Sequence, residues 1–113
     1  MKLVILMRTD LGMSKGKMVA QGAHATSKAT RSAQQDLYNP WFYSGEPKIV
    51  LKVPSKTELI SLIKAAGIAE LPCGFIMDAG LTKFQGIATL TCGWIGPAKN
   101  AEIDLITSEL KLL

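Results

Sequence analysis

The sequence has few cysteine and histidine residues and lacks a long apolar run. These absences argue against a disulfide scaffold, a zinc site and a membrane span. Its 113 residues include two cysteines and one histidine. Two cysteines are too few for a disulfide scaffold, and with one histidine they nearly exclude a zinc site of several Cys and His ligands. No apolar run approaches the roughly 18 residues that a membrane span needs. We therefore expect no metal site, no membrane span and a reducing, cytoplasmic environment.

Acidic residues are scarce in the first third of the chain. The whole sequence carries 13 basic and 9 acidic residues, for a net charge of +4. Residues 1–35 contain six basic residues and a single acid, Asp10, and no acid occurs between Lys15 and Gln35. A solvated basic helix is one explanation, but such helices usually mix acids among their bases. The pattern therefore favours an anionic partner, with a nucleic-acid backbone as the leading candidate.

Apolar runs alternate with helical spacings, which predicts one α/β domain over residues 1–113 with a mixed sheet. The short connection after residue 78 predicts that the third and fourth strands pair antiparallel if they are adjacent. Residues 36–47 contain two prolines and three adjacent aromatics and are predicted to form a loop. We expect a possible bulge at Gly93, and a strand end at Gly96-Pro97. The predicted strands are residues 2–7, 48–53, 73–77 and 87–95, and the predicted helices are residues 17–35, 56–66 and 102–108.

The loop between the first strand and the first helix resembles a phosphate-binding turn. Residues 12–17 read Gly-Met-Ser-Lys-Gly-Lys, and Ser14 is placed to cap the helix that follows. The segment is not a Walker A motif, because only three residues separate its glycines and Met18 follows Lys17. Nucleotide hydrolysis is thus disfavoured, while an anion site and an ordinary loop both remain open.

Polar side chains recur at helical spacing along the first helix. We expect one polar stripe that continues the anion site. The opposite face, expected to pack on the sheet, carries the small residues Val19, Gly22, Ala23, Ala29 and Ala33. His24 is the single imidazole, and Asp78 ends a strand, where ligands gather in such folds. Each has a structural alternative, a helix-face hydrogen bond for His24 and an Asx turn for Asp78. The stripe consists of Lys17, Gln21, His24, Lys28 and Arg31.

Several motifs, in order along the whole chain, resemble the archaeal/eukaryotic-type (type 2) peptidyl-tRNA hydrolases. The first is residues 7–25, MRTDLGMSKGKMVAQGAHA, and the second is the D-A-G-L-T turn at residues 78–82. Residues 95–97, I-G-P, and the terminal L-K-L-L complete the match. Many members have Arg after D-A-G, where this chain has Leu81.

This resemblance implies a mixed four-stranded sheet with helices on both faces, usually in a homodimer. It implies hydrolysis of the ester between a peptide and the tRNA 3′ end, which recycles tRNA for translation, without a metal or organic cofactor. The residues implicated in activity fall on Lys17, Asp78, Thr82 and Thr89. Gln21 and His24 are expected to line the site, and Lys15, Lys28 and Arg31 to hold tRNA by backbone contacts.

The residues themselves indicate a chemistry that is compatible with this resemblance. Asp78 is the candidate to orient or deprotonate water, and Lys17 the candidate to stabilise an oxyanion. No strong nucleophile with a paired base is visible, so direct attack by water is favoured over an acyl-enzyme. The alternatives are a noncatalytic RNA-binding module on the same scaffold and a protein whose basic helix docks an acidic partner. The aromatic segment, the apolar tail at residues 110–113 and the fourth strand lead us to expect a homodimer.

Overall fold

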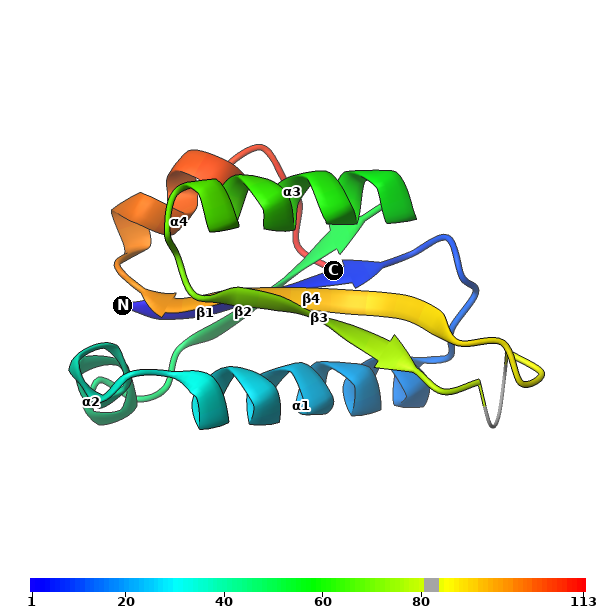
Figure 1. The fold of residues 1–113 in the computed structure, drawn as a ribbon, viewed down its shortest axis with the longest axis horizontal. Helices are drawn as coiled ribbons and strands as arrows, with labels where there is room; N and C mark the ends of the chain where they lie inside the picture. Colours follow the sequence, from blue (N-terminus) through cyan, green and yellow to red (C-terminus); the bar gives the residue numbers. More distant parts are fainter. Residues whose placement is uncertain (81–83) are drawn as a thin grey trace.

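A four-stranded mixed sheet forms the centre of the fold (Figure 1). The computed structural model describes residues 1–80 and 84–113. The strand order is β2-β1-β4-β3, with β1 parallel to β2 and β4 antiparallel to both of its neighbours. The predicted α/β class, mixed sheet and antiparallel third and fourth strands are confirmed. The elements are β1 (Lys2–Arg8), α1 (Lys15–Ser32), α2 (Gln35–Tyr43), β2 (Lys48–Val53), α3 (Lys56–Ile68), β3 (Cys73–Asp78), β4 (Thr89–Ala98) and α4 (Asn100–Thr107).

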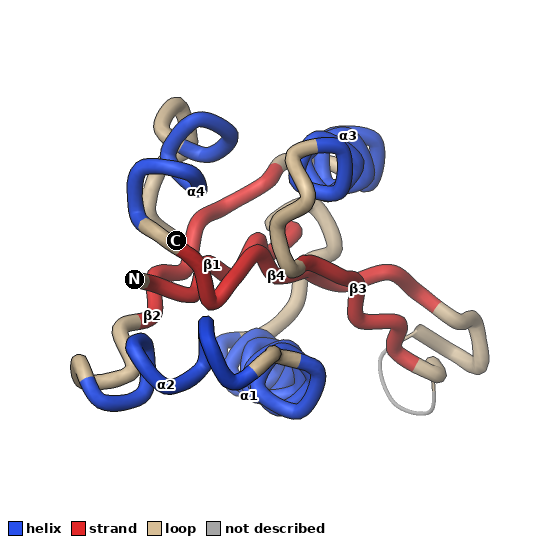
Figure 2. The backbone as a smooth tube through the Cα atoms, turned by 60° about the vertical axis from the view of Figure 1, so that its left-hand side comes forward, coloured by secondary structure: helices blue, strands red, loops and turns tan. Residues whose placement is uncertain are grey.

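Helices cover both faces of the sheet. Helices α3 and α4 lie on one face and α1 and α2 on the other, as the end-on view in Figure 2 shows. Strand β1 is buried on both faces, as its continuous apolar run predicts. Its Val4 and Leu6 enter a core shared with α3, whereas Leu3, Ile5 and Met7 enter a core shared with α1 and α2. The sheet therefore separates two cores.

Serine caps fix where two of the helices begin. The Ser14 hydroxyl accepts a hydrogen bond from the Lys17 amide at 3.1 Å, which confirms the predicted cap of α1. Ser55 accepts from the Glu58 amide at 3.2 Å and caps α3 in the same way. The cap on α1 matters for the site, because it sets the direction in which the first turn presents Lys17.

The prediction of a loop over residues 36–47 is wrong, because most of this segment is helix α2. Pro40 lies inside the helix, so one backbone hydrogen bond, to the carbonyl of Asp36, is not made. The compensation is Trp41, which is fully buried and donates its indole N–H to the Pro47 carbonyl at 2.9 Å. Local turn signals predicted a loop, and the burial of one large aromatic side chain reversed that preference.

Two predictions for β4 are also wrong. The register shift in the β3–β4 pair falls at Thr91 and not at Gly93, because Ile76 pairs with Cys92 while Met77 pairs with Leu90. The strand also continues through Gly96-Pro97 to Ala98. A second register shift there brings the strand close to β1, and a Cβ on Gly96 would lie 2.6 Å from the Lys2 carbonyl oxygen. Gly96 is thus required by a close approach between strands.

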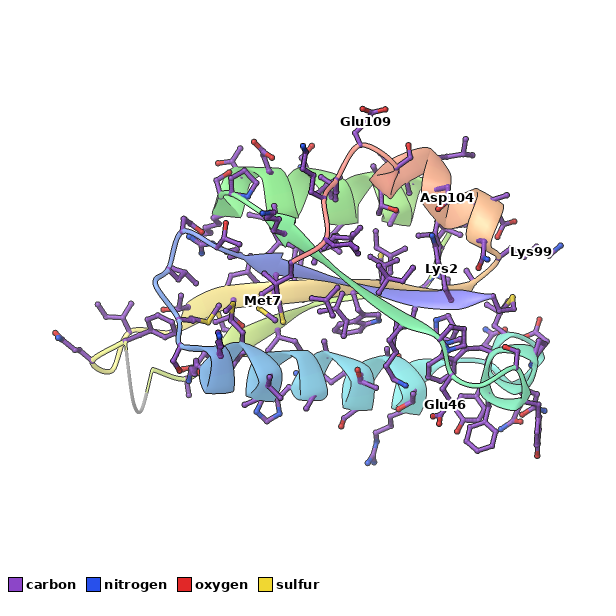
Figure 3. The ribbon with its side chains drawn as sticks, turned by 180° about the vertical axis from the view of Figure 1, so that it is seen from behind. Lys2, Met7, Glu46, Lys99, Asp104 and Glu109 are labelled. Atoms are coloured by element: carbon purple, nitrogen blue, oxygen red, sulfur yellow. The ribbon has the colours of Figure 1, made fainter. Side chains whose placement is uncertain are left out.

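The chain ends pack against the sheet. Leu112 bridges Leu51, and the Leu113 amide donates to the Val50 carbonyl at 3.0 Å, so the tail covers the outer edge of β2. The Lys2 ammonium pairs with Asp104 and ties β1 to α4; Figure 3 shows the two side chains together. Within the described residues, no helix is both long enough and apolar enough to cross a membrane.

Candidate functional site

An ion pair joins the first turn of α1 to the end of β3. The Lys17 ammonium lies 2.6 Å from Asp78 Oδ2, although the two residues are 61 positions apart in the chain. Both side chains are mostly buried, with 19% and 11% of their surface exposed. Residues 78 and 17 were predicted to share a site, and the structure brings them into direct contact.

Gln21, one turn after Lys17, links Asp78 to the interior. Its amide nitrogen donates to Asp78 Oδ2 at 3.1 Å, and its amide oxygen accepts a hydrogen bond from the Thr91 hydroxyl at 2.5 Å. Gln21 is 3% exposed and Thr91 is fully buried. Because the hydroxyl donates to the amide oxygen, the amide nitrogen is turned toward Asp78. The chain Thr91–Gln21–Asp78–Lys17 is therefore one connected polar network.

The bulge at Thr91 makes this network possible. In a regular antiparallel strand, consecutive residues point to opposite faces. The extra residue in β4 lets the side chains of Thr91 and Cys92 both reach Gln21: the Thr91 hydroxyl contacts its side chain, and the Cys92 thiol contacts its backbone carbonyl at 3.5 Å. Sequence reasoning missed Thr91, because its only local signal is a threonine in a strand, which is ordinary.

The turn after β3 holds the second oxygen of Asp78. The Gly80 amide donates to Asp78 Oδ1 at 2.6 Å, which is the Asx turn that was one alternative for this residue. Gly80 has a φ of +82°, and a Cβ there would lie 2.5 Å from the Ile87 carbonyl oxygen, so only glycine fits. The two alternatives for Asp78 are therefore compatible, since the turn itself aims the carboxylate at Lys17.

The charge state of Asp78 follows from these contacts. The Lys17 ammonium, and after it the Gly80 amide, hold the pKa of the Asp78 carboxyl below its ordinary value. Asp78 is therefore a carboxylate at neutral pH. Such a carboxylate is a weak base, and it is better suited to orienting a water molecule and an ammonium than to holding a proton.

Thr89 and Thr82 are the two threonines expected in the site. Thr89 pairs with Asp78 across the β3–β4 ladder, and directly opposed residues project to the same face of a sheet. Its hydroxyl donates to the Ile87 carbonyl at 2.9 Å. Thr82 lies outside the described residues. Phe84, just beyond, places its ring 5.6 Å from the Lys17 ammonium in a cation–π contact.

The predicted polar stripe on α1 is divided by burial. His24, Lys28 and Arg31 are exposed, as expected, but Gln21 is buried and faces the sheet. The five side chains therefore do not share one solvent-facing stripe, because Gln21 is buried and Lys17 is mostly buried against Asp78. The small-residue face was also misplaced in part, because Val19 is 72% exposed while Ala25 and Ala29 pack on the sheet. The side of α1 that faces the sheet is the one that carries Gln21, Ala25 and Ala29, and Gln21 on that side contacts Asp78.

Lys15 and the loop before it lie apart from Asp78. Lys15 is exposed and borders an apolar groove of about 640 Å³ on the opposite flank of α1. Val19 and Leu113 also line that groove. The anion site expected in residues 12–17 stays a prediction, and Lys17 is the residue of this loop and first turn that the structure joins to Asp78.

Cys92 is the thiol nearest to this network. It is fully buried, and burial raises the pKa of its thiol to about 11. It is therefore protonated at neutral pH and is no nucleophile. Among the described residues, no three His, Cys, Asp or Glu side chains gather in a way that would hold a metal ion.

Comparison with known proteins shows the family of this chain. The family described as Peptidyl-tRNA hydrolase PTH2 matches residues 1–113. The peptidyl-tRNA hydrolase of Methanocaldococcus jannaschii is 48% identical over 118 aligned residues, which cover all of both chains. That of Metallosphaera sedula is 42% identical over all of both chains, and that of Halobacterium salinarum 43% identical over 99% of each.

By these comparisons the chain is an α/β domain of a class of hydrolases that act on esters. The chain belongs to the peptidyl-tRNA hydrolase PTH2 family, which confirms the family predicted from the motifs at residues 7–25 and 78–82.

Proposed function

We propose that this protein hydrolyses the ester bond between a peptide and the 3′ end of tRNA. The observation that carries the proposal is the Lys17–Asp78 pair, held by a buried network in a chain of this family. The products are a free peptide and a tRNA that can be charged again for translation. The reaction as written needs only water as co-substrate and calls for no cofactor.

Lys17 is the group that stabilises negative charge. When water attacks the ester carbonyl, the carbonyl oxygen becomes an oxyanion, and an ammonium beside it lowers the energy of that state. The contact with Asp78 fixes the ammonium before substrate arrives, which reduces reorganisation during the reaction. The Phe84 ring covers another side of the ammonium.

Asp78 orients the attacking water. Oδ2 already accepts hydrogen bonds from Lys17 and Gln21, while Oδ1 accepts one from the Gly80 amide and has a second lone pair for water. Thr89, opposite Asp78 in the ladder, is placed to contact the same water or the ester carbonyl. Thr82 keeps the role that the family resemblance implies for it.

Direct attack by water is favoured over a covalent intermediate. Cys92, the thiol in contact with Gln21, is buried and protonated. An acyl-enzyme also needs a base within hydrogen-bond reach of its nucleophile. The carboxylate of this network instead pairs with an ammonium.

The exposed cations of α1 are proposed to hold the tRNA. Lys28 and Arg31 are exposed and follow the exposed His24 along α1, and Lys15 stands at the start of the helix. Gln21 is assigned to positioning Asp78, because its side chain is buried.

The test of this tRNA surface is the double variant Lys28→Ala, Arg31→Ala. Side chains that neutralise phosphates release counterions and so contribute to affinity, and their removal should raise KM. It should also flatten the salt dependence of log affinity by about 0.7–0.9 for each phosphate that is no longer neutralised. An unchanged salt slope would contradict this assignment.

The decisive test is release of labelled N-acetylphenylalanine from N-acetylphenylalanyl-tRNA by the purified protein, with and without EDTA. Hydrolysis that persists in EDTA and is lost in Lys17→Ala supports the proposal. Lys64→Ala is the matched control, since Lys64 is an exposed lysine on α3, across the sheet. Tight tRNA binding without hydrolysis would instead favour the noncatalytic RNA-binding module.

We also propose a homodimer in the cytoplasm. The fourth strand no longer supports a dimer, because β4 lies between β1 and β3. The support that remains is exposed apolar surface: Tyr43 is 81% exposed, and Val19 and Leu113 border the 640 Å³ apolar groove. Light scattering should give twice the chain mass of 12.2 kDa. Two free cysteines fit a reducing compartment.

A further inference from the structure

A buried arginine stands at the end of β1, next to the bulge in β4. Only 10% of the Arg8 side chain is exposed. Its Nε and Nη2 donate to the two carboxylate oxygens of Asp10 at 3.0 and 2.7 Å, and its Nη1 donates to the Leu90 carbonyl at 2.8 Å. Since each nitrogen has a partner and the side chain is buried, Arg8 is poorly placed to bind a phosphate of tRNA.

We propose that Arg8 is a positioning residue for the hydrolytic site, which acts by holding the peptide unit between Leu90 and Thr91. Through that peptide unit it sets the direction of the Thr91 hydroxyl, and with it the Gln21 amide that orients Asp78. The inference rests on the proposed function and adds to it a residue that does not touch the substrate.

The backbone at the bulge needs a partner from outside the ladder. A bulge locally disrupts the hydrogen bonds between strands. The pairing of β1 with β4 ends at Met7 and Cys92, and two residues further along β4 the Arg8 side chain donates to the Leu90 carbonyl. Because a carbonyl and the amide that follows it lie in one plane, this bond also fixes the peptide plane from which Thr91 begins.

The direction of the Thr91 hydroxyl matters because two acceptors lie close to it. The hydroxyl oxygen is 2.5 Å from the Gln21 amide oxygen and 3.4 Å from the Ile76 carbonyl. A hydroxyl has one hydrogen to donate. A small rotation of the preceding peptide plane would turn that hydrogen toward Ile76, and the Gln21 amide would then lose the bond that points its nitrogen at Asp78.

Asp10 holds the guanidinium in the orientation that this role requires. Two parallel hydrogen bonds between a guanidinium and a carboxylate fix the plane of both groups. The Arg8 guanidinium also holds the pKa of the Asp10 carboxyl below its ordinary value, so the pair is charged at neutral pH. The remaining nitrogen of Arg8 is thereby aimed at the Leu90 carbonyl.

The test compares Arg8→Gln with Lys2→Gln, which removes an ion pair at the opposite end of the same strand. Hydrolysis of N-acetylphenylalanyl-tRNA gives kcat and KM, and urea unfolding gives the stability of each variant. NMR of the Gln21 side-chain amide reports its hydrogen bonds in the absence of substrate. A purely structural arginine would change stability without moving kcat or this resonance.

We expect Arg8→Gln to lower kcat about 10-fold with KM unchanged, the scale of losing one hydrogen bond, and to shift the Gln21 amide resonance. In the Thr91→Val background the same change should lower kcat no further, because the residue through which Arg8 acts is already altered. Lys2→Gln should leave kcat and the Gln21 resonance at their wild-type values.

Other outcomes overturn the inference without touching the proposed function. An equal loss of kcat in both backgrounds would mean that Arg8 acts by a route other than Thr91. Lower stability with unchanged kcat and an unchanged Gln21 resonance would make Arg8 purely structural. If Arg8→Gln does not fold, Asp10→Asn removes the charge that orients the guanidinium and is held to the same outcomes.

Failure of the proposed function is distinguishable from failure of this inference. If the wild-type protein hydrolyses no N-acetylphenylalanyl-tRNA, the proposed function fails. The Gln21 resonance then decides by itself whether Arg8 positions this amide, since it is measured without substrate.

Discussion

The two faces of the sheet are packed with different kinds of side chain. The face under α3 and α4 is filled by aliphatic side chains such as Leu59 and Ile63. The face under α1 and α2 contains Trp41, Met7 and Cys92, and next to them the buried polar pair Gln21 and Thr91. The two faces share the same strands, and β1 contributes alternate residues to each.

This difference indicates that one face mainly stabilises the fold and the other also positions the site. Aliphatic packing needs no partners for polar atoms and contributes stability in proportion to the area it buries. A buried amide and hydroxyl must satisfy each other, and they do so in a geometry that also aims Asp78. We therefore expect substitutions under α3 to change stability and substitutions under α1 to change activity.

The largest expected effect is on the ion pair itself. Lys17→Ala and Asp78→Asn should each lower kcat on the order of 100-fold or more, the scale seen for losing one oxyanion donor. The double variant should lose less than the two effects combined, because the groups act together. Single-turnover hydrolysis measures kcat, and thermal melts check the fold. A folded variant with nearly wild-type kcat would contradict these roles and direct attention to His24 as the base.

The next largest effect is a loss of stability on the α3 face of the sheet. Leu59 lies on the sheet-facing side of α3 and is fully buried, so Leu59→Ala should lower the free energy of unfolding by about 2–5 kcal/mol. Its kcat/KM should stay within about 2-fold of wild type at a temperature where the variant is folded, since the cavity lies across the sheet from Asp78. Urea unfolding and kinetics on one preparation give both numbers. A large loss of kcat would mean that the faces are coupled.

A smaller effect is expected at Thr91. Thr91→Val keeps the shape but leaves the Gln21 amide oxygen unpaired, a cost of about 1–3 kcal/mol for a buried group. The amide is then free to rotate away from Asp78, so kcat should fall about 10-fold while KM holds. Thr91→Ser, which restores the hydroxyl, should recover most of kcat. A stability loss with unchanged kcat would make Thr91 purely structural.

The smallest effect is in the response to acid. The pKa of Asp78 is lower in the folded state than in the unfolded chain, so its stabilising contribution is complete above the unfolded value. That contribution is lost as pH falls from the unfolded value through the lower folded one. The stability difference between wild type and Asp78→Asn should therefore shrink as the pH drops below about 4. Urea unfolding at pH 3 and pH 7 measures it, and a difference that grows with acid would contradict the assigned direction.

Much of the fold is predictable from local patterns. The apolar run of β1 predicts a doubly buried strand, and Ser14 predicts the start of α1 within two residues. The aromatic segment is predictable only in part, because Pro40 and Gly45 signal a turn locally while Trp41 needs a core that distant strands build. The same limit applies to Gly93 and Gly96, whose roles depend on the neighbouring strands.

By itself, the sequence determined the class of fold, the family, and the two charged residues that meet. Periodicity, caps and motif order are local properties, and Lys17 and Asp78 lie at element ends where such a fold gathers its ligands. Only the tertiary structure decided that Gln21 turns inward and that Thr91 supports it. That choice depends on a register shift between β3 and β4, and a one-residue shift decides which face a side chain reaches. A residue 70 positions from Gln21 then completes the site, because strand pairing brings its hydroxyl within 2.5 Å of the Gln21 amide oxygen.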